Sequence, residues 1–332
     1  MSETAGWIPA RSTQDWHEAL QGLAELPAMT PAYAQAAERV TGHEAGLWWC
    51  RQASGSAACA LQRRPSPGGG YHLATPIGFG GFALAGDPDL ERGWTQFWRD
   101  KGALAAYVQL APEPGDRSWT DALAPLSGNL SASRECCLWD LHPEPEALVA
   151  GMSSKHRQLL HKWQRESVGL SFDRERLEPE FNRLYGEFIA RRELSPAYHY
   201  DAEAICLLAN DPGSLFVGAC AADGSVEAVM LFLSRGRDAD SFLSASTVAG
   251  RRHSRGLYWQ GALALRERGV RRLNLGGGLS DGDELSQFKQ RLGATRVPTL
   301  ALRQLFDPAG FDRACQQAGL PADAGGRFPP WA

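Results

Sequence analysis

Residues 273–293 read LNLGGGLSDGDELSQFKQRLG, and here three consecutive glycines follow a short apolar run. An acidic loop comes next, followed by Phe288-Lys289 on a predicted helix. The chain has four lysines against thirty arginines, so a lysine in this place is unusual for the composition. Lysine carries a compact ammonium whose pKa shifts readily, whereas arginine carries a rigid and permanently charged fork. The segment is therefore the first candidate for a functional site.

The local pattern predicts a strand, a turn and a helix. Residues 270–275 are typical of a short buried strand. Glycines at 276–278 allow a sharp turn with positive φ and bring backbone N–H groups close to a ligand. The acidic residues that suit the first helical turns are Asp281, Asp283 and Glu284. The side chains expected to face the core from that helix are Leu285, Phe288 and Leu292.

Lys289 stands one position beyond Phe288, at the edge of the predicted apolar face. A desolvated lysine there can offset the charge that develops on an oxygen in a tetrahedral intermediate. The alternative is a surface lysine whose stem covers its neighbours while the ammonium stays in water. Taken alone, the segment favours this alternative, because glycines are common in the chain.

Length and composition indicate a globular protein of two domains. The 332 residues are 43% hydrophobic and 22% charged. We find no apolar run of about 18 residues and no secretory signal, so we expect a cytoplasmic protein without a transmembrane segment. The cysteines are seven in number and form no C-x-x-C pair. Neither a disulfide framework nor a metal site is therefore expected.

Charge is distributed unevenly along the chain. Residues 1–150 carry a net charge of −7, residues 151–305 carry +4 and residues 306–332 carry −1. The basic middle suits an anionic substrate such as a phosphate, coenzyme A or a tRNA end, or it is scatter between two solvated surfaces. The sequence pI of 6.1 argues against a dedicated nucleic-acid-binding domain, and no DNA partner is expected.

Periodicity and turn residues predict alternating helices and strands, which is an α/β fold. In the first half, helices are predicted at 30–41 and 90–101, and strands at 47–51, 57–62, 105–110 and 138–141. In the second half, helices are predicted at 146–167, 178–191, 202–208 and 258–269, and strands at 170–172, 215–221, 226–233, 240–246 and 270–275. Asp223-Gly224 indicates a hairpin. We place the domain boundary near Pro143–Pro145.

Other candidate residues have simpler explanations. His253 lies in a basic loop and is a candidate base, although a loop histidine is more often a surface group. His156 and His161 are five residues apart, which does not suit a shared metal. No Gly-x-Ser-x-Gly elbow supports a serine hydrolase.

With its neighbours, the opening segment closely resembles the C-terminal signature of the Fem family of acyl-transferring proteins. That pattern is a strand, Asp/Asn-Leu-Gly-Gly, a polar loop, then Phe-Lys and a nearby glycine. The residues that fill it here are Asn274, Leu275, Gly276, Gly277, Phe288, Lys289 and Gly293. Four further pieces resemble family motifs in the right order, and they are Thr75–Gly81, Ser153–Arg157, Arg191-Arg192 with Tyr198 and Tyr200, and Arg252–Gly269.

The resemblance spans roughly residues 30–305 and implies two tandem acetyltransferase-like (GNAT-type) domains, each a mixed central sheet with flanking helices. The expected ranges are 1–145 for the first domain, 146–305 for the second and 306–332 for a tail that packs back on the first. By resemblance, Lys289 stabilises the tetrahedral intermediate or the leaving oxygen, and Phe288 positions it. The expected substrate-binding residues are Gly276, Gly277, Gly278, Arg192, Tyr200, Arg157 and Arg255.

The implied activity is N-acyl transfer without a tightly bound cofactor. The donor is aminoacyl-tRNA or acyl-CoA, and the acceptor is an amine of a peptide, an amino sugar or a cell-envelope or natural-product precursor. Arg251–Gly256 resembles an acetyltransferase pyrophosphate loop, which keeps the CoA alternative open. A catalytically silent binding protein is the second alternative. We expect a bacterial protein that is a monomer.

Overall fold

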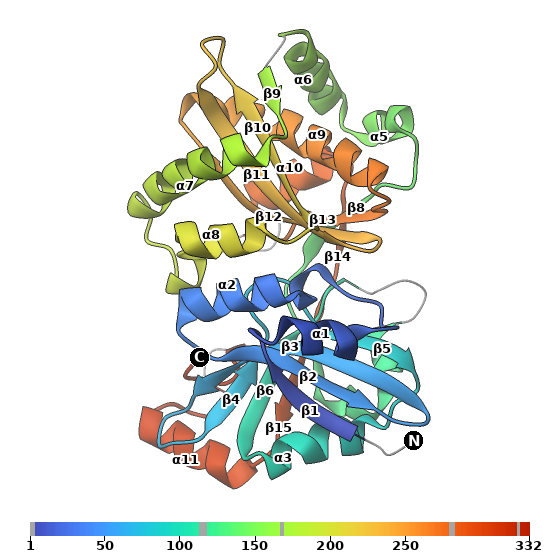
Figure 1. The fold of residues 1–332 in the computed structure, drawn as a ribbon, viewed down its shortest axis with the longest axis vertical. Coiled ribbons are helices and arrows are strands. Elements are labelled where there is room, and N and C mark those ends of the chain that lie inside the picture. The colour runs from blue at the N-terminus through green and yellow to red at the C-terminus, as the bar shows by residue number, and fades with distance from the viewer. Residues whose placement is uncertain (1–3, 113–117, 167–168, 279–282, 324–325) are drawn as a thin grey trace. The chain divides into compact units, whose positions relative to one another are not determined.

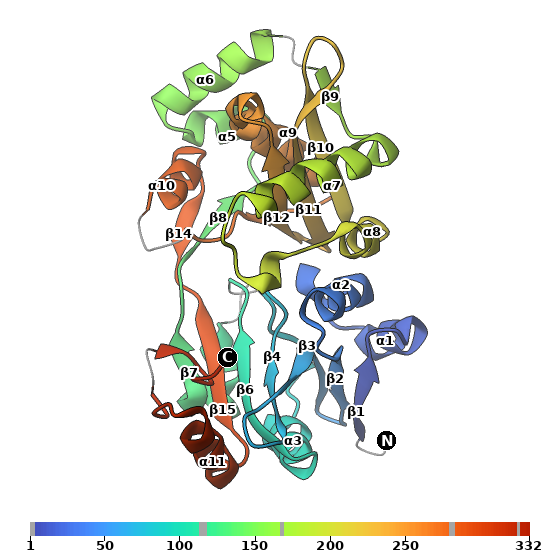
Figure 2. The same cartoon turned by 90° about the vertical axis from the view of Figure 1, so that its left-hand side faces the viewer.

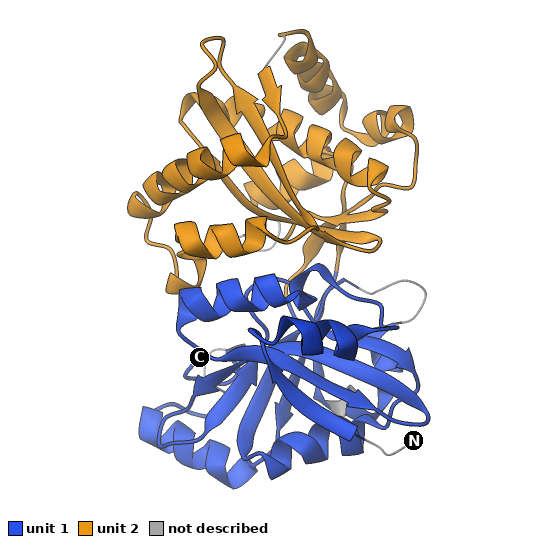
Figure 3. Cartoon of the chain, viewed as in Figure 1, with its two compact units in different colours: residues 1–133, 298–332 blue, residues 134–297 orange. Residues whose placement is uncertain are grey.

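The computed structural model describes residues 4–112, 118–166, 169–278, 283–323 and 326–332. The chain forms two compact units, residues 1–133 with 298–332 and residues 134–297 (Figure 3). Within the described ranges, no helix is both long and apolar enough to cross a bilayer. All seven cysteines are free thiols.

Unit 1 is built on one mixed sheet (Figure 1). Its strands in spatial order are β1 (Thr4–Pro9), β2 (Ala45–Arg51), β3 (Gly55–Pro65), β4 (Tyr71–Ala74), β6 (Ala103–Gln109), β15 (Leu300–Leu305) and β7 (Leu130–Ala132), with β5 (Phe82–Gly86) paired to β3. The pairing of β4 with β6 is parallel, and the other pairs of described strands are antiparallel.

Helices cover both faces of this sheet. They are α1 (Thr13–Leu20), η1 (Pro27–Met29), α2 (Pro31–Thr41), η2 (Glu91–Gln96), α3 (Phe97–Asp100), α4 (Trp119–Ala122), η3 (Ala124–Asn129) and α11 (Pro308–Ala318). Trp16 and Met29 pack on one face, and Trp94 and Trp98 pack on the other. Helix α2 follows its sequence signals, because the Thr30 side chain caps it and Gly42 ends it at φ +68°.

Unit 2 repeats the plan with a second mixed sheet (Figure 2). Its strand order is β14 (Thr295–Val297), β8 (Cys136–Asp140), β13 (Arg272–Asn274), β12 (Asp238–Ser246), β11 (Val226–Arg235), β10 (Ser214–Cys220) and β9 (Gly169–Ser171). Here β12 and β13 are the parallel pair. The helices are α5 (Pro145–Gly151), α6 (Ser154–Arg165), α7 (Arg174–Ala190), η4 (Pro196–Tyr198), α8 (Ala202–Ala209), η5 (Ala249–His253), α9 (Ser254–Glu267) and α10 (Glu284–Arg291).

One apolar core of unit 2 lies between the sheet and the helices α5, α6, α9 and α10. Trp139, Phe232 and Leu273 supply it from the strands, and Trp259 and Leu292 supply it from the helical side. Helices α7 and α8 pack on the strands β10–β12 through a separate set of buried side chains, among them Phe181 and Leu208. The α/β architecture expected from the sequence is therefore present in both units.

The unit boundaries differ from the predicted ranges. Strand β8 precedes residue 145 but pairs with β13 and β14, so it belongs to unit 2. Strand β15 precedes residue 306 but pairs with β6 and β7, so it belongs to unit 1. Both exchanges are strand pairings between segments distant in sequence, which periodicity does not reveal. The tail packs on unit 1, where Phe311 and Cys315 contact Ala105.

Candidate functional site

The glycine turn directly follows β13 in unit 2. Gly276 has φ +73°, its N–H donates to Asn274 Oδ1 at 2.8 Å, and its carbonyl accepts from Cys137 N at 3.1 Å. A Cβ atom on Gly277 would lie 2.6 Å from the Glu135 carbonyl oxygen, and one on Gly278 would collide with the Asp283 carboxyl. Glycine is thus required by conformation at 276 and by close backbone packing at 277, whereas at 278 a side chain would displace the Asp283 carboxyl.

Two details of the predicted turn change. Positive φ occurs at Gly276 and not at Gly277 or Gly278. The N–H of Gly276 is satisfied by the side chain two residues earlier, so it is not offered to a ligand as predicted. Asp281 lies outside the described residues, whereas Asp283 caps α10 by accepting from Ser286 N at 2.8 Å.

Helix α10 buries polar side chains against the rest of unit 2. Its buried residues are Ser286 and Lys289, and Phe288 packs partly buried against the unit 2 core. Leu285 is 44% exposed, so the prediction that it faces the core is wrong. The buried face is rotated towards Ser286 and Lys289 because both find polar neighbours inside, and Cys137 Sγ lies 3.8 Å from the Ser286 hydroxyl.

Lys289 is a buried lysine at 5% exposure, which excludes the snorkelling surface position. Its Nζ donates to the Gly277 carbonyl oxygen at 2.6 Å. Burial lowers the pKa of Lys289, while the nearby Cys137, Asp283 and Cys136 act in the opposite direction. The glycine turn and Lys289 are therefore in direct contact, and a backbone carbonyl holds the amine.

Phe288 lies among basic and aromatic side chains. Its ring centroid is 5.5 Å from that of His156 and 6.1 Å from that of Tyr258, and the Arg255 guanidinium lies 5.9 Å above the ring. The predicted residue Arg255 thus belongs to the same cluster as Phe288. Burial, helped by Arg255 and Arg291, lowers the pKa of His156 to about 4. The sequence did not single out His156 for this site, although the Ser-Ser-Lys-His-Arg motif contains it.

A second group missed by the sequence lies at the parallel strand pair. Asp240 is opposite Asn274 in the β12–β13 register, and the Asn274 side chain hydrogen-bonds to its carboxyl. Burial raises the pKa of Asp240 to about 7, the Asn274 hydrogen bond opposes this, and Asp238 adds to it. The available signal was an acidic residue at the start of a predicted strand that alternates serines with apolar residues.

The remaining predicted residues lie elsewhere. Arg157 donates to the carbonyl oxygens of Ala150 and Met152 and so closes the end of α5. Arg192 is exposed and lies 5.0 Å from the Phe188 ring centroid. Tyr200 is buried against Phe242, and burial raises the pKa of its phenol. In the described parts of unit 2, no contact joins Arg157, Arg192 or Tyr200 to Lys289.

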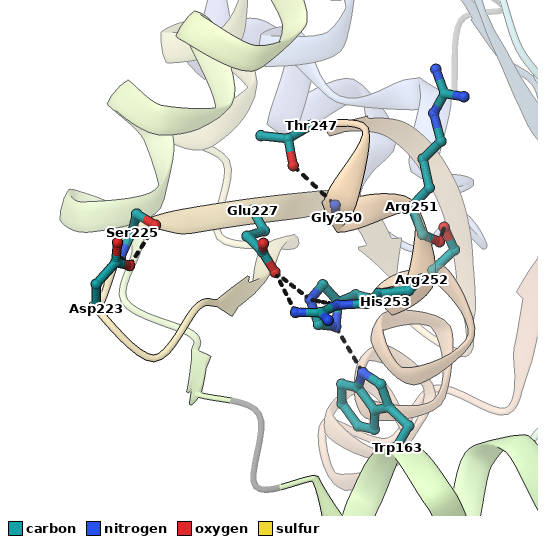
Figure 4. A network of polar contacts seen from close by, with 10 residues as sticks. Trp163, Asp223, Ser225, Glu227, Thr247, Gly250, Arg251, Arg252 and His253 are labelled. Atoms are coloured by element: carbon teal, nitrogen blue, oxygen red, sulfur yellow. Dashed lines mark hydrogen bonds and ion pairs between the residues drawn. The ribbon is translucent and has the colours of Figure 1, made fainter.

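The basic loop before α9 is held by a buried histidine (Figure 4). His253 is 1% exposed, so it is not a surface group; its Nδ1 accepts from Trp163 Nε1 at 2.9 Å, and its Nε2 contacts Glu227 Oε2 at 2.7 Å. Arg252 also donates to Glu227, at 3.1 Å. With both ring nitrogens engaged, His253 positions the loop and is poorly placed to act as a base.

Comparison with solved structures identifies the fold. The crystal structure of FemX matches with a TM-score of 0.68 at 12% identity, covering 94% of this chain and 99% of that one. The C-terminal domain of a putative lysylphosphatidylglycerol synthetase from Agrobacterium fabrum matches with 0.54 at 16% identity, covering 96% and 100%. L-PGS from Bacillus licheniformis matches with 0.55 at 12% identity, covering 92% and 96%.

No family model matches the chain, and no curated protein matches it in sequence. The likeness is therefore one of fold. It confirms the fold expected from the motifs, a Fem-like arrangement of two tandem GNAT-like units.

Proposed function

We propose that the chain is an N-acyltransferase of the Fem/GNAT type. It moves an aminoacyl or acyl group from an activated donor to an amine of a peptide, an amino sugar or a cell-envelope or natural-product precursor. Two observations support the proposal, the likeness to FemX and to lysylphosphatidylglycerol synthetases and the cluster around Lys289. The buried contact from Lys289 Nζ to the Gly277 carbonyl is the observation on which it chiefly rests.

In this mechanism the acceptor amine attacks the acyl carbonyl carbon, and negative charge develops on the carbonyl oxygen. An ammonium has three N–H donors, and the Gly277 carbonyl orients Lys289 through one of them. A preoriented cation in a water-poor site stabilises such an oxyanion far more than it would in water. Burial lowers the pKa of Lys289, and the nearby Cys137 and Asp283 oppose this and favour its charged form. Phe288 packs against the unit 2 core and fixes the turn of α10 that carries the lysine.

The main test is the substitution Lys289→Met. A neutral side chain of similar length should lower the transfer rate by about 10²–10³, equivalent to roughly 2.7–4 kcal/mol of barrier. Lys162→Met is the matched control, because Lys162 lies on the surface of α6 and makes an i,i+4 pair with Glu166 at 3.8 Å. Wild-type transfer by a folded Lys289→Met variant would remove the role proposed for Lys289.

The donor is aminoacyl-tRNA in the primary form of the proposal and acyl-CoA in the alternative. A specific feature favours testing CoA, because Arg251, Arg252 and Arg255 cluster around the start of α9, where a phosphate is favoured. Ribonuclease sensitivity of the transfer indicates tRNA. Dependence on an added CoA thioester, with resistance to ribonuclease, indicates the alternative.

A catalytically silent binding protein is the competing function from another class. Thermal unfolding with coenzyme A and with aminoacyl-tRNA mimics separates it from an enzyme. Stabilisation by a ligand without turnover would favour the binding protein.

A further inference from the structure

We infer that Asp240 is the general base of the proposed transfer reaction, linked to the lysine site by Asn274 and the glycine turn. The inference rests on the proposed function and adds to it the residue that takes the proton of the acceptor amine. It is carried by a continuous chain of polar contacts on adjoining elements of unit 2.

This series of polar contacts begins where the two parallel strands stop pairing. The β12–β13 register ends with Asp240 opposite Asn274. Asn274 is buried at 5% exposure and uses its side chain twice, towards the Asp240 carboxyl and towards Gly276 N. An amide can do both, because its NH₂ donates while its oxygen accepts. Asn274 therefore fixes the carboxyl of Asp240 relative to the turn.

From the turn the contacts continue to the lysine. Gly277 follows Gly276, and its carbonyl accepts from Lys289 Nζ at 2.6 Å. Cys136 on β8 lies within electrostatic range of both Asp240 and Lys289. A group that removes a proton and a group that meets an oxyanion thus lie at the two ends of one short polar path.

The surroundings of Asp240 suit a base that works near neutral pH. Asp240 as a whole residue is of intermediate exposure, while the surrounding protein desolvates its carboxyl. Asp238 on the same strand faces it and is paired with Arg272 at 2.7 Å, and Cys136 faces it from β8. Helix α7, which packs on β12, buries Tyr185 as its titratable group and is otherwise apolar on that face. A raised pKa near the working pH is what efficient proton abstraction requires.

The Asp240 carboxylate takes one proton from the acceptor ammonium, and the neutral amine forms a C–N bond to the acyl carbon. The electrons of the carbonyl bond move to the oxygen beside Lys289 and return as the acyl C–O bond of an ester, or the C–S bond of a thioester, breaks. A second proton from nitrogen goes to the leaving group, and Asp240 releases its proton to solvent.

The test is the pH profile of kcat/KM for wild type, Asp240→Asn and the control Asp223→Asn. Asp223 lies in the exposed β10–β11 turn, where it accepts from Ser225. We expect the wild-type rate to rise tenfold per pH unit up to about pH 7. Asp240→Asn should lower the plateau about 10²–10⁴-fold and remove this limb, whereas Asp223→Asn should match wild type.

A second variant covers the case in which Asp240→Asn does not fold. Asn274→Ala removes the hydrogen bond that favours the carboxylate, so the limb should move to higher pH, a shift that a purely structural role would not produce. Transfer that depends on Lys289 but keeps its rate and profile in Asp240→Asn would overturn this inference alone. Absence of transfer by wild type with either donor would overturn the proposed function and Asp240 with it.

Discussion

The two units each contain one parallel strand pair, and the two pairs end differently. In unit 1 the segment after β4 stays bonded to β6 and its continuation, because Thr75 N donates to Tyr107 O, Gly80 N to Gln109 O and Ala111 N to Gly80 O. In unit 2 the β12–β13 pairing ends at Asp240 and Asn274. Beyond that point the chain after β13 stays bonded to β8 on its other side, with Leu275 N donating to Cys137 O.

The two parallel strand pairs also differ in the ionisable residues that lie near them. In unit 1 the segment that follows the parallel pair β4–β6 is held by uncharged side chains. Tyr33 donates to the Ile77 carbonyl, and Trp119 donates to Ala111 O. At the pair of unit 2, Lys289 and Asp240 are near the strand ends, and burial moves both of their pKa values. Shared architecture therefore does not imply shared chemistry, and the proposed transfer belongs to the unit whose strands separate.

Among the variants that compare the two units, the largest effect is expected from Gly277→Ala, tested against Gly80→Ala in unit 1. The new methyl group would lie 2.6 Å from the Glu135 carbonyl oxygen, so the backbone that holds Lys289 must move. A displacement of about 1 Å at such a site lowers catalysis about 10²-fold, which single-turnover transfer measures. At Gly80 the methyl group would meet the Thr75 side chain at 3.1 Å, and transfer should stay near wild type. Equal losses in the two variants would contradict the division between the units.

Much of the fold could be predicted from the sequence because its signals are local. Thr30 and Gly42 bound α2, and the Asp223-Gly224 turn joins β10 to β11, both as expected. The positions of β8 and β15 could not be predicted in this way, because their partners are distant in sequence.

The candidate site likewise contains residues that local sequence signals predict and residues that they do not. The Phe288-Lys289 pair and the glycine turn are neighbours in sequence and form a recognisable motif. Asp240 and His156 reach the site region from other elements, and their altered pKa values arise from burial, which no spacing reports. Arg157 shows the converse, since a basic motif residue serves to close a helix.

The two units should also differ in how pH changes the free energy of unfolding, an effect smaller than that of Gly277→Ala and larger than that of Leu285→Gln. Burial lowers the pKa of His72 in unit 1 to about 3, below the unfolded value, so the unfolded chain binds more protons in acid and stability falls as pH drops below about 6.5. Asp240 in unit 2 acts oppositely, since its folded pKa of about 7 exceeds the unfolded value and stability falls as pH rises from about 4 to 7.

Denaturant unfolding at several pH values tests both signs. His72→Asn should reduce the loss of unfolding free energy below about pH 6.5. Asp240→Asn should reduce the loss between about pH 4 and 7. Each change in the free energy of unfolding should be on the order of 1–4 kcal/mol. The His72 ring accepts from Trp331 Nε1 at 3.3 Å, which an asparagine oxygen can also do. A steeper acid limb in His72→Asn would show that this imidazole is charged in the folded protein.

The smallest effect is expected at Leu285, the residue that the helical pattern placed wrongly. Leu285 is 44% exposed and Leu292, two turns later, is fully buried, although a straight amphipathic helix would put both on one face. Leu285→Gln should change the free energy of unfolding by no more than about 0.5 kcal/mol, whereas Leu292→Ala should cost about 2–5 kcal/mol. A large loss in Leu285→Gln would mean that α10 buries its apolar row and not the Ser286–Lys289 edge, and the carbonyl-held lysine would then lose its structural basis.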